Sequence, residues 1–335
     1  MTDATLQTVL LRDERSSLQA TFVPGAGMLC ASLRHGGEEL LAQNAGIDAY
    51  ATRGKTMGIP LLYPWANRLA GMSYSVAGRT VTLPHDPTRI ALDGNGLPIH
   101  GVIGGRLRWQ VTTPTSGTTS DSIFARLTWS ESTSDSTSDS VSGLAPELFE
   151  LFPFRHDLEY RAQLDDGRMQ IEVTVHASGE DPVPVAFGFH PYLSLTGASR
   201  ERWSIELPAM RGLQLDAHQI PTGSARALSA QRFELGEREF DDGFDSLAEP
   251  AHFSATACAA AAGAATAAEV RRIELESLNG YPCAQVYAPR GTDFICFEPM
   301  TAPANALRSG IGLRVLDPGE RYTAAFAVQV TNAAS

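Results

Sequence analysis

The feature that most constrains the fold is a strict alternation of side-chain character over residues 168–176. The apolar members, which would share one face, are Met169, Ile171, Val173 and Val175. A period of two is typical of a β-strand with one buried face. The preceding Asp165-Asp166-Gly167 is a hairpin turn signal, so we expect residues 157–164 to pair with this strand.

Short runs of the same kind recur along the chain, and turn residues separate most of them. They lie at 18–23, 29–34, 74–83, 107–112, 123–129, 183–190, 203–207, 283–288, 293–298 and 322–331. Convincing amphipathic helices are few, and no segment of 20–50 residues repeats. The pattern therefore predicts an all-β chain that folds as a sandwich or barrel.

Two low-complexity segments interrupt this pattern, and no clear domain boundary is visible. Residues 130–142 are rich in Ser and Thr, which have little to bury, so we expect a surface insertion there. Residues 251–268 are rich in alanine, and we expect a second surface insertion, either a short helix or a loop. The whole chain, residues 1–335, is expected to form a single domain.

The charge balance excludes several classes of protein. The 335 residues carry 26 Lys+Arg and 38 Asp+Glu, a formal net charge of −12, and Lys55 is the only lysine. Nucleic-acid binding needs a basic face, and membrane anchoring by charge needs a polybasic cluster, so neither partner is expected. No apolar run is long enough for a transmembrane helix, and residues 1–7 do not read as a secretory signal.

The cysteines indicate a reducing compartment and no metal site. They are Cys30, Cys258, Cys283 and Cys296, which are far apart in the sequence. Structural zinc sites need closely spaced ligand pairs, and no HxH or HExxH spacing is present. We therefore expect free thiols, a cytoplasmic location, no metal and no cofactor, in a monomer or a homodimer.

Two segments place chemically useful side chains among glycine and proline. The first, 58–68, contains two prolines and ends in Asn67-Arg68, where the fixed donor fork of Arg68 could hold substrate hydroxyls or, alternatively, tie down the loop. The second, 94–101, leads into His100 beside a glycine, which is either accessible to a ligand or a surface histidine without a role.

Two further segments each end an apolar run in an ionisable group. In 185–192, His190 precedes Pro191, and a histidine there can hold its pKa near neutrality as a proton donor, or be a satisfied core residue. In 294–305, Glu298 ends an apolar strand, where desolvation would raise its pKa toward that of a general base. The alternative is a structural carboxylate with a salt-bridge partner.

Taken together, these segments resemble the aldose 1-epimerase, or galactose mutarotase, family. The resemblance rests on GIPLLYPWANRLAG, IHG, FGFHPYL, FDDGF, CFEPMTAPANAL and LDPGERY, which follow one another in the family's order from residue 58 to residue 322. It implies a large antiparallel β-sandwich with an open carbohydrate cleft. It also implies a cofactor-independent isomerase that interconverts the α and β anomers of a free hexose.

The resemblance also implies roles for individual residues. Glu298 matches the general base and His190 the general acid. His100 matches a histidine near the sugar ring oxygen, and Arg68, beside Asn67, matches a substrate-binding arginine. We expect His190 and Glu298 to face each other across a gap one pyranose wide.

One motif departs from the family pattern, and other functions stay open. The family's substrate-binding aspartate falls in Phe240-Asp241-Asp242-Gly243-Phe244-Asp245, where we expect Asp241, then Asp242, then Asp245, to have the role. Tyr63, Trp65 and Tyr192 could offer flat faces to a sugar. The alternatives are a non-catalytic carbohydrate-binding sandwich and an epimerase of hexose phosphates, for which Arg53, Lys55 and Arg68 would be phosphate ligands.

Overall fold

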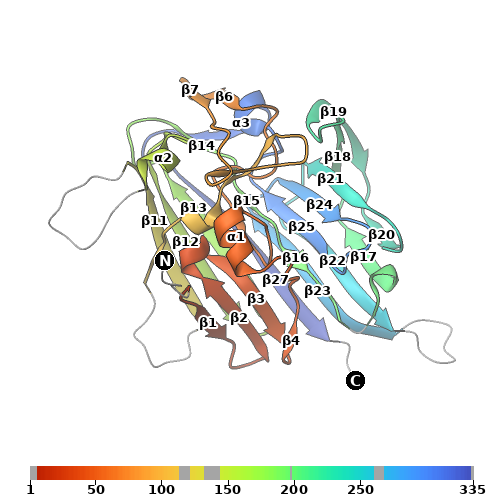
Figure 1. The fold of residues 1–335 in the computed structure, drawn as a ribbon. Coiled ribbons are helices and arrows are strands. Elements are labelled where there is room, and N and C mark those ends of the chain that lie inside the picture. Colours follow the sequence, from red (N-terminus) through yellow and green to blue (C-terminus); the bar gives the residue numbers. More distant parts are fainter. Residues whose placement is uncertain (1–5, 113–120, 132–143, 197, 260–267, 333–335) are drawn as a thin grey trace.

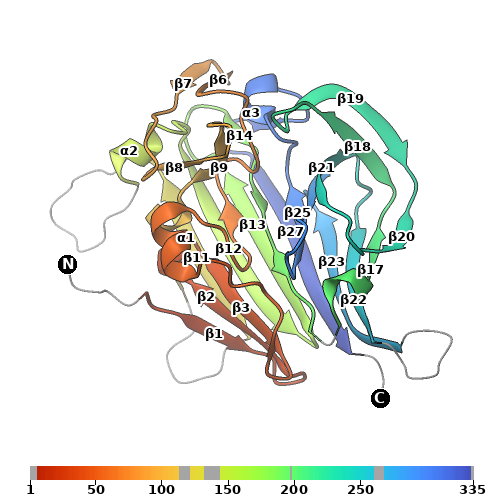
Figure 2. The same ribbon diagram turned by 45° about the vertical axis from the view of Figure 1, so that its right-hand side comes forward.

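The computed structural model describes residues 6–112, 121–131, 144–196, 198–259 and 268–332. Two large antiparallel sheets form two layers, with shorter strands, loops and helices at the ends and over one face (Figure 1 and Figure 2). This arrangement confirms the all-β sandwich that the sequence predicts.

The larger sheet has nine strands and contains the predicted hairpin. Its strands, in spatial order, are β10 (Gln110–Val111), β11 (Ser122–Trp129), β12 (His156–Asp165), β13 (Arg168–His176), β27 (Arg321–Asn332), β23 (Ala268–Asn279), β22 (Ala251–Ala259), β17 (Trp203–Leu207) and β20 (Gln231–Glu234). Leu164 pairs with Met169 and Asp165 with Arg168 across the turn, as the alternation predicts. The four apolar residues of β13 are at most 1% exposed.

The second sheet has eight strands and provides most of the candidate site. Its strands are β19 (Pro221–Leu228), β18 (Met210–Leu215), β21 (Phe240–Asp245), β24 (Cys283–Ala288), β25 (Ile295–Met300), β15 (Gly188–Phe189) and β5 (Leu61–Leu62), and β16 (Tyr192–Leu193) also pairs with β25. Aromatic contacts join the two sheets. The ring centre of Phe297 in β25 lies 5.5 Å from that of Phe253 in β22, and the ring centre of Phe189 lies 4.9 Å from that of Phe326 in β27. One face of β25 is thus fixed by the core.

Smaller elements complete the fold around these sheets. The four-stranded sheet comprises β1 (Val9–Arg12), β2 (Leu18–Val23), β3 (Leu29–His35) and β4 (Glu38–Glu39), and the two-stranded ones pair β6 (Ser73–Val76) with β7 (Arg79–Thr82), β8 (Ile90–Leu92) with β9 (Pro98–Val102) and β14 (Val183–Val185) with β26 (Arg314–Leu316). The helices are α1 (Ile47–Arg53), α2 (Pro146–Phe149) and α3 (Ala306–Ser309), with 3₁₀ turns at Pro24–Ala26, Gly104–Arg106 and Arg200–Arg202. Among the described residues, none of these helices has the length and apolar character needed to cross a bilayer.

The alanine-rich segment differs from its prediction. Residues 251–259 form β22 and residue 268 begins β23, so a central part of the nine-stranded sheet stands where we expected a helix or loop. Alanine has little strand propensity of its own, but Ala255 is fully buried and pairs with Ile273, so tertiary packing decides its conformation. Residues 260–267, and residues 132–142 of the Ser/Thr-rich segment, lie outside the described residues.

The loop that follows β5 crosses close to β9. Tyr63 and Gly101 form an isolated bridge, and a Cβ atom added to Gly101 would lie 2.1 Å from the Tyr63 carbonyl oxygen. Gly101 also has φ +72°, a conformation that side chains disfavour. This contact holds the segment ending in Arg68 against the strand that carries His100.

We predict that Gly101→Ala strongly destabilises the protein, because it adds a backbone clash to an unfavourable φ. The free energy of unfolding, measured by urea titration, should fall by about 2 kcal/mol more than in Gly96→Ala. Gly96 has a similar φ of +76° but open space around its Cβ position, so it isolates the backbone strain. Equal losses in the two variants would contradict the clash.

Candidate active site

His190 and Glu298 lie in direct contact on the eight-stranded sheet. Gly188 of β15 pairs with Met300, and Tyr192 of β16 pairs with Cys296, so the short interruption between β15 and β16 runs alongside the middle of β25. This interruption brings Nε2 of His190 to 3.3 Å from Oε1 of Glu298. The structure brings the predicted pair together, but with these two polar atoms 3.3 Å apart in place of the expected pyranose-wide gap.

Burial shifts the two pKa values of this pair in opposite directions. The His190 residue is 5% exposed and Glu298 is 2% exposed. Removal from water raises the pKa of Glu298 well above its usual range, and the charge of Asp241 adds to this. Burial lowers the pKa of His190 well below its usual range, with the nearby His100 contributing, so His190 is not held near neutrality as the sequence suggested.

His100 stands beside this pair. It lies in β9 with φ +64°, and its ring centre is 5.5 Å from that of His190 in an edge-to-face arrangement. Its backbone N–H donates to the Asn67 carbonyl oxygen at 3.0 Å. Burial, with Arg68 nearby, lowers the pKa of His100 to about 3, which favours a neutral imidazole.

Arg68 is held between two carboxylates. Its Nε donates to Oδ2 of Asp93 at 2.9 Å, and its terminal Nη2 lies 3.5 Å from Oδ2 of Asp241. Its Nη1 donates to the side-chain oxygen of Asn67 at 3.3 Å. These contacts fix the plane of the guanidinium, so its donors point in set directions.

Asp93 organises the loop that leads to His100. Its Oδ1 accepts from the backbone N–H groups of Asn95 and Leu97 at 2.8 and 2.9 Å. Burial alone would raise the pKa of Asp93, but these bonds and Arg68 outweigh it and lower the pKa. Asp93 therefore stabilises this loop and orients the Arg68 side chain at the same time.

The structure separates the three aspartates of β21. Asp241 points toward the site, where its Oδ1 accepts from Nε2 of Gln285 at 2.6 Å. Asp242 is the next residue on the strand and lines a pocket on the opposite face. Asp245 forms a two-bond pair with Arg211, at 2.7 and 2.6 Å. Of the three, Asp241 is the one beside Arg68.

The three aromatic residues predicted to face a sugar lie in different environments. The Tyr192 ring stacks on His190, with ring centres 4.3 Å apart, and its hydroxyl lies 2.6 Å from Oγ1 of Thr56. Tyr63 and Trp65 are instead buried in the core, where Tyr63 contacts His156 and Trp65 packs near Tyr74. These two rings offer no face to a sugar, and Tyr192 supports the imidazole.

Three polar atoms in this region are buried without a hydrogen-bond partner among the described residues. They are Oε2 of Glu298, Nδ1 of His190 and Nδ1 of His100. A buried polar atom without a partner costs free energy, so the presence of three such atoms on neighbouring site residues favours a polar ligand. Within the described ranges, no group of three His, Cys, Asp or Glu residues is arranged to hold a metal ion.

Sequence reasoning missed two residues of this site, Asp93 and Gln285. Asp93 begins an Asp-Gly-Asn-Gly turn, which signals a loop but gives no sign of its ion pair with Arg68. Gln285 pairs with Glu298 across β24 and β25 and is 3% exposed. A lone amide in an otherwise apolar strand was the available signal for Gln285.

The fold is that of the galactose mutarotase-like β-sandwich proteins. A solved structure of the Slr1438 protein from Synechocystis sp. PCC 6803 matches with a TM-score of 0.71 at 23% identity, covering 99% of this chain and 98% of that one. The GalM/aldose epimerase homologue from C. elegans matches with a TM-score of 0.72 at 16% identity, covering 98% and 99%.

The sequence comparisons identify the family. The family model for aldose 1-epimerase matches residues 8–329, so the chain belongs to the aldose 1-epimerase family. It is also 22% identical over 267 residues to the Uncharacterized protein YihR of Escherichia coli K12, covering 78% of this chain and 75% of that protein.

We predict that His100 and His190 stay neutral well below the ordinary histidine pKa of 6.5, because burial disfavours the imidazolium form. The ring signals of the histidines in a pH-dependent NMR titration measure the two pKa values directly. Each signal is assigned by its loss in the variant His100→Asn or His190→Asn. At pH values between 5 and 6, both rings should give the spectrum of neutral imidazole. A titration midpoint at or above 6.5 for either ring would contradict the prediction.

Proposed function

We propose that this protein is an aldose 1-epimerase that interconverts the α and β anomers of a free hexose by acid–base catalysis. The observation that carries the proposal is the buried contact between His190 and Glu298, which places a proton donor and a proton acceptor 3.3 Å apart. Membership of the aldose 1-epimerase family supports the same reaction class.

The reaction opens the hemiacetal ring with one acid and one base. In the free protein the single proton of the pair lies on Glu298, and its transfer to His190, 3.3 Å away, gives the reactive form. In that form the Glu298 carboxylate removes the proton of the C1 hydroxyl, and the protonated His190 gives its proton to the ring oxygen O5. The C1–O5 bond breaks, C1 becomes an aldehyde carbon and O5 becomes a hydroxyl. No atom is oxidised or reduced, and the pair still holds one proton.

Reclosure reverses these transfers on the other face of the carbonyl. After rotation about the C1–C2 bond, neutral His190 removes the O5 proton while the carboxylic acid of Glu298 protonates the aldehyde oxygen. Burial of the pair favours this uncharged form, because it raises the pKa of Glu298 and lowers that of His190. The shifts therefore support the open-chain stage, and each cycle restores the original proton.

A direct contact suits this chemistry better than a wide gap. The C1 hydroxyl oxygen and O5 are bonded to the same carbon, so the acid and the base must reach atoms only two bonds apart. A sugar that presents these two oxygens to the common edge of His190 and Glu298 meets both groups at once. The expected separation across the whole ring was wrong for this geometric reason.

The surrounding polar groups would hold the remaining hydroxyls. Arg68 and Asp241 form a donor and an acceptor on one side, with Gln285 fixing Asp241 and Asn67 bonding Arg68. The neutral imidazole of His100 would contact the sugar near its ring oxygen. Hydroxyls can donate and accept, so they match such a mixed set.

The charge of the site favours an unphosphorylated sugar. Arg68 supplies one positive charge and contacts two carboxylates, Asp93 and Asp241. The pair of His190 and Glu298 is neutral overall when it holds one proton. A phosphate group would add negative charge to a site that already has an excess of it, and like charges in a buried site repel strongly.

We predict that Glu298→Gln folds but loses about a hundredfold to ten-thousandfold of the epimerase rate, because an amide cannot take the proton. The measurement is polarimetry on freshly dissolved α-D-glucose and α-D-galactose. Glu239→Gln, at an exposed position, is the matched control and should retain the wild-type rate. A wild-type rate in Glu298→Gln would remove Glu298 from the role of base.

The non-catalytic carbohydrate-binding alternative makes a different prediction for the wild-type protein. It requires sugar binding, measured by calorimetry, with an anomer exchange rate equal to that of buffer alone. Such a module has no use for a desolvated acid–base pair, whose burial costs free energy. The contact between His190 and Glu298 therefore favours the enzyme.

We predict that Asp93→Asn raises KM about tenfold with a smaller effect on kcat, because Arg68 loses a charged hydrogen-bond partner while the acid–base pair stays in place. Initial-rate polarimetry over a range of hexose concentrations measures both parameters. The matched control is Asp86→Asn, since the Asp86 carboxylate accepts from the N–H and the hydroxyl of Thr88 within the preceding loop. A KM for Asp93→Asn equal to that of Asp86→Asn would contradict the positioning of Arg68 by Asp93.

A further inference from the structure

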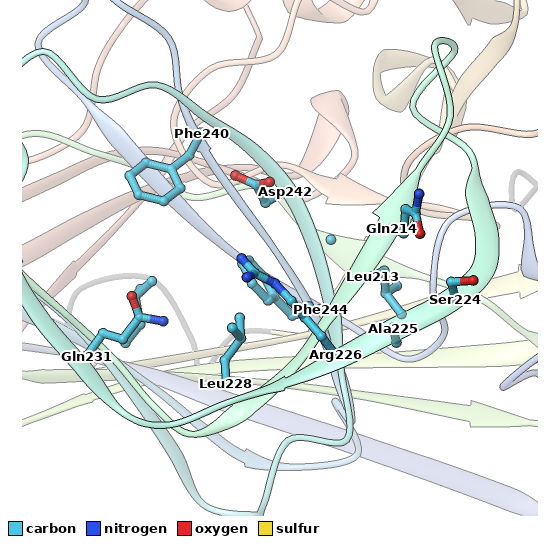
Figure 3. A pocket seen from close by; sticks show the side chains of 13 residues that line it. Leu213, Gln214, Ser224, Ala225, Arg226, Leu228, Gln231, Phe240, Asp242 and Phe244 are labelled. Atoms are coloured by element: carbon cyan, nitrogen blue, oxygen red, sulfur yellow. The ribbon is translucent and has the colours of Figure 1, made fainter.

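A second polar pocket lies on the opposite face of β21 from the acid–base pair. Its volume is about 440 Å³, and residues of β17, β18, β19, β20 and β21 line it (Figure 3). This volume falls in the range of about 300–1,000 Å³ that is typical of small-molecule sites. Its lining includes neither Glu298 nor His190, so it is separate from the candidate active site.

The strand register explains the separation. Asp241 pairs with Tyr287 and Asp242 with Val286 across β21 and β24. Because successive residues of a strand point to opposite faces, Asp241 faces Arg68 while Asp242 faces the pocket. On the neighbouring hairpin, Arg226 of β19 pairs with Gly212 of β18, which in turn pairs with Phe244 of β21.

Two opposite charges face this pocket without forming an ion pair. Arg226 and Asp242 both line it and are directed into it in Figure 3, and neither forms an ion pair among the described residues. Partial removal from water raises the pKa of Asp242, the charge of Asp241 adds to this, and the charge of Arg226 opposes it. Both groups therefore have hydrogen-bonding capacity that the described part of the chain does not use.

The rest of the lining combines amides with apolar surface. Gln214 and Gln231 can each donate and accept hydrogen bonds, and Leu228 and Phe244 supply apolar walls. The absence of a side chain at Gly212 leaves room there, since a Cβ atom would lie 3.0 Å from Leu228 and 3.8 Å from Phe244. The pocket thus has planar polar groups on part of its lining and apolar side chains on the rest.

We propose that this pocket is a second ligand site, which binds a neutral saccharide. A sugar hydroxyl can donate to Asp242, which only accepts when ionised, and another can accept from Arg226, which only donates. The C–H face of a pyranose ring can pack on Phe244 and Leu228. A simple carboxylate would satisfy Arg226 but meet Asp242 with the same sign of charge, and a simple cation would meet Arg226 in the same way.

The test uses sugars whose rings cannot open, so that it reads binding without turnover. Methyl α-D-glucopyranoside and methyl β-D-galactopyranoside are titrated into the full chain carrying ¹³C-labelled leucine methyl groups. Leu207, Leu213 and Leu228 report on the pocket, and Leu62, which lies near His100, reports on the active-site side. At least one glycoside should shift the signals of the three pocket leucines.

Variants of the pocket wall complete the test. Arg226→Ala should weaken these shifts by about tenfold in apparent affinity, since it removes a charged donor. Ser224→Trp should abolish them by filling the pocket, and both variants should keep the wild-type response at Leu62. Arg15→Ala, which removes an equal charge from the distant four-stranded sheet region, is the control and should bind as wild type.

Three results would overturn the proposal. The first is the absence of any shift at the pocket leucines with both glycosides. The second is a set of shifts that Arg226→Ala and Ser224→Trp leave unchanged, which would place the ligand elsewhere. The third is an equal response to sodium acetate or methylammonium, which would assign the pocket to simple ions. None of these readings depends on epimerase activity.

Discussion

The candidate site depends on one constraint, the way β25 is held between the core and the loops. Phe297 packs into the core between the two sheets, so its neighbour Glu298 must point to the other face. On that face, the interruption between β15 and β16 places His190 against it. Neither group is solvated, and each is the nearest polar partner of the other, which explains why their pKa values shift in opposite directions. In a solvent-exposed version of this pair, both groups would retain their ordinary pKa values, so the carboxyl group would lose its proton more readily and the imidazole would keep its proton more readily.

A second set of contacts ties the substrate-facing groups to this pair. Tyr63 bridges to Gly101, and Asn67 accepts from the backbone N–H of His100, so the segments that carry Arg68 and His100 form one unit. Asp93 on one side and Asp241 on the other then fix the guanidinium of Arg68. The same strand that supplies Asp241 presents Asp242 to the second pocket. If that pocket binds a saccharide, β21 is the element that both sites share.

The sequence predicted the parts of this structure that repeat a local pattern. The hairpin of β12 and β13 follows from alternation and a turn signal, and the histidines and Glu298 stand out because ionisable groups rarely end apolar strands. The hairpin of β18 and β19 was not predicted, because β19 is largely exposed and shows no alternation. The alanine-rich β22 was misassigned, since pairing with β17 and β23 decides its conformation. The contacts of Asp93 and Gln285 in the site, and the lowered pKa of His190, depend on neighbours that are distant in the sequence. A single amino-acid sequence does not show which distant residues become neighbours.

The central claim is that the contact between His190 and Glu298 catalyses exchange of the two anomers of a free hexose. Two-dimensional NMR exchange spectroscopy on an equilibrated hexose measures this directly, because cross-peaks between the α and β anomeric protons report the interconversion rate without any coupling enzyme. With the wild-type protein present in small amounts, the account predicts exchange of D-glucose or D-galactose that is much faster than in buffer and proportional to protein concentration. Exchange at the rate of buffer alone, for a sugar shown to bind, would contradict it.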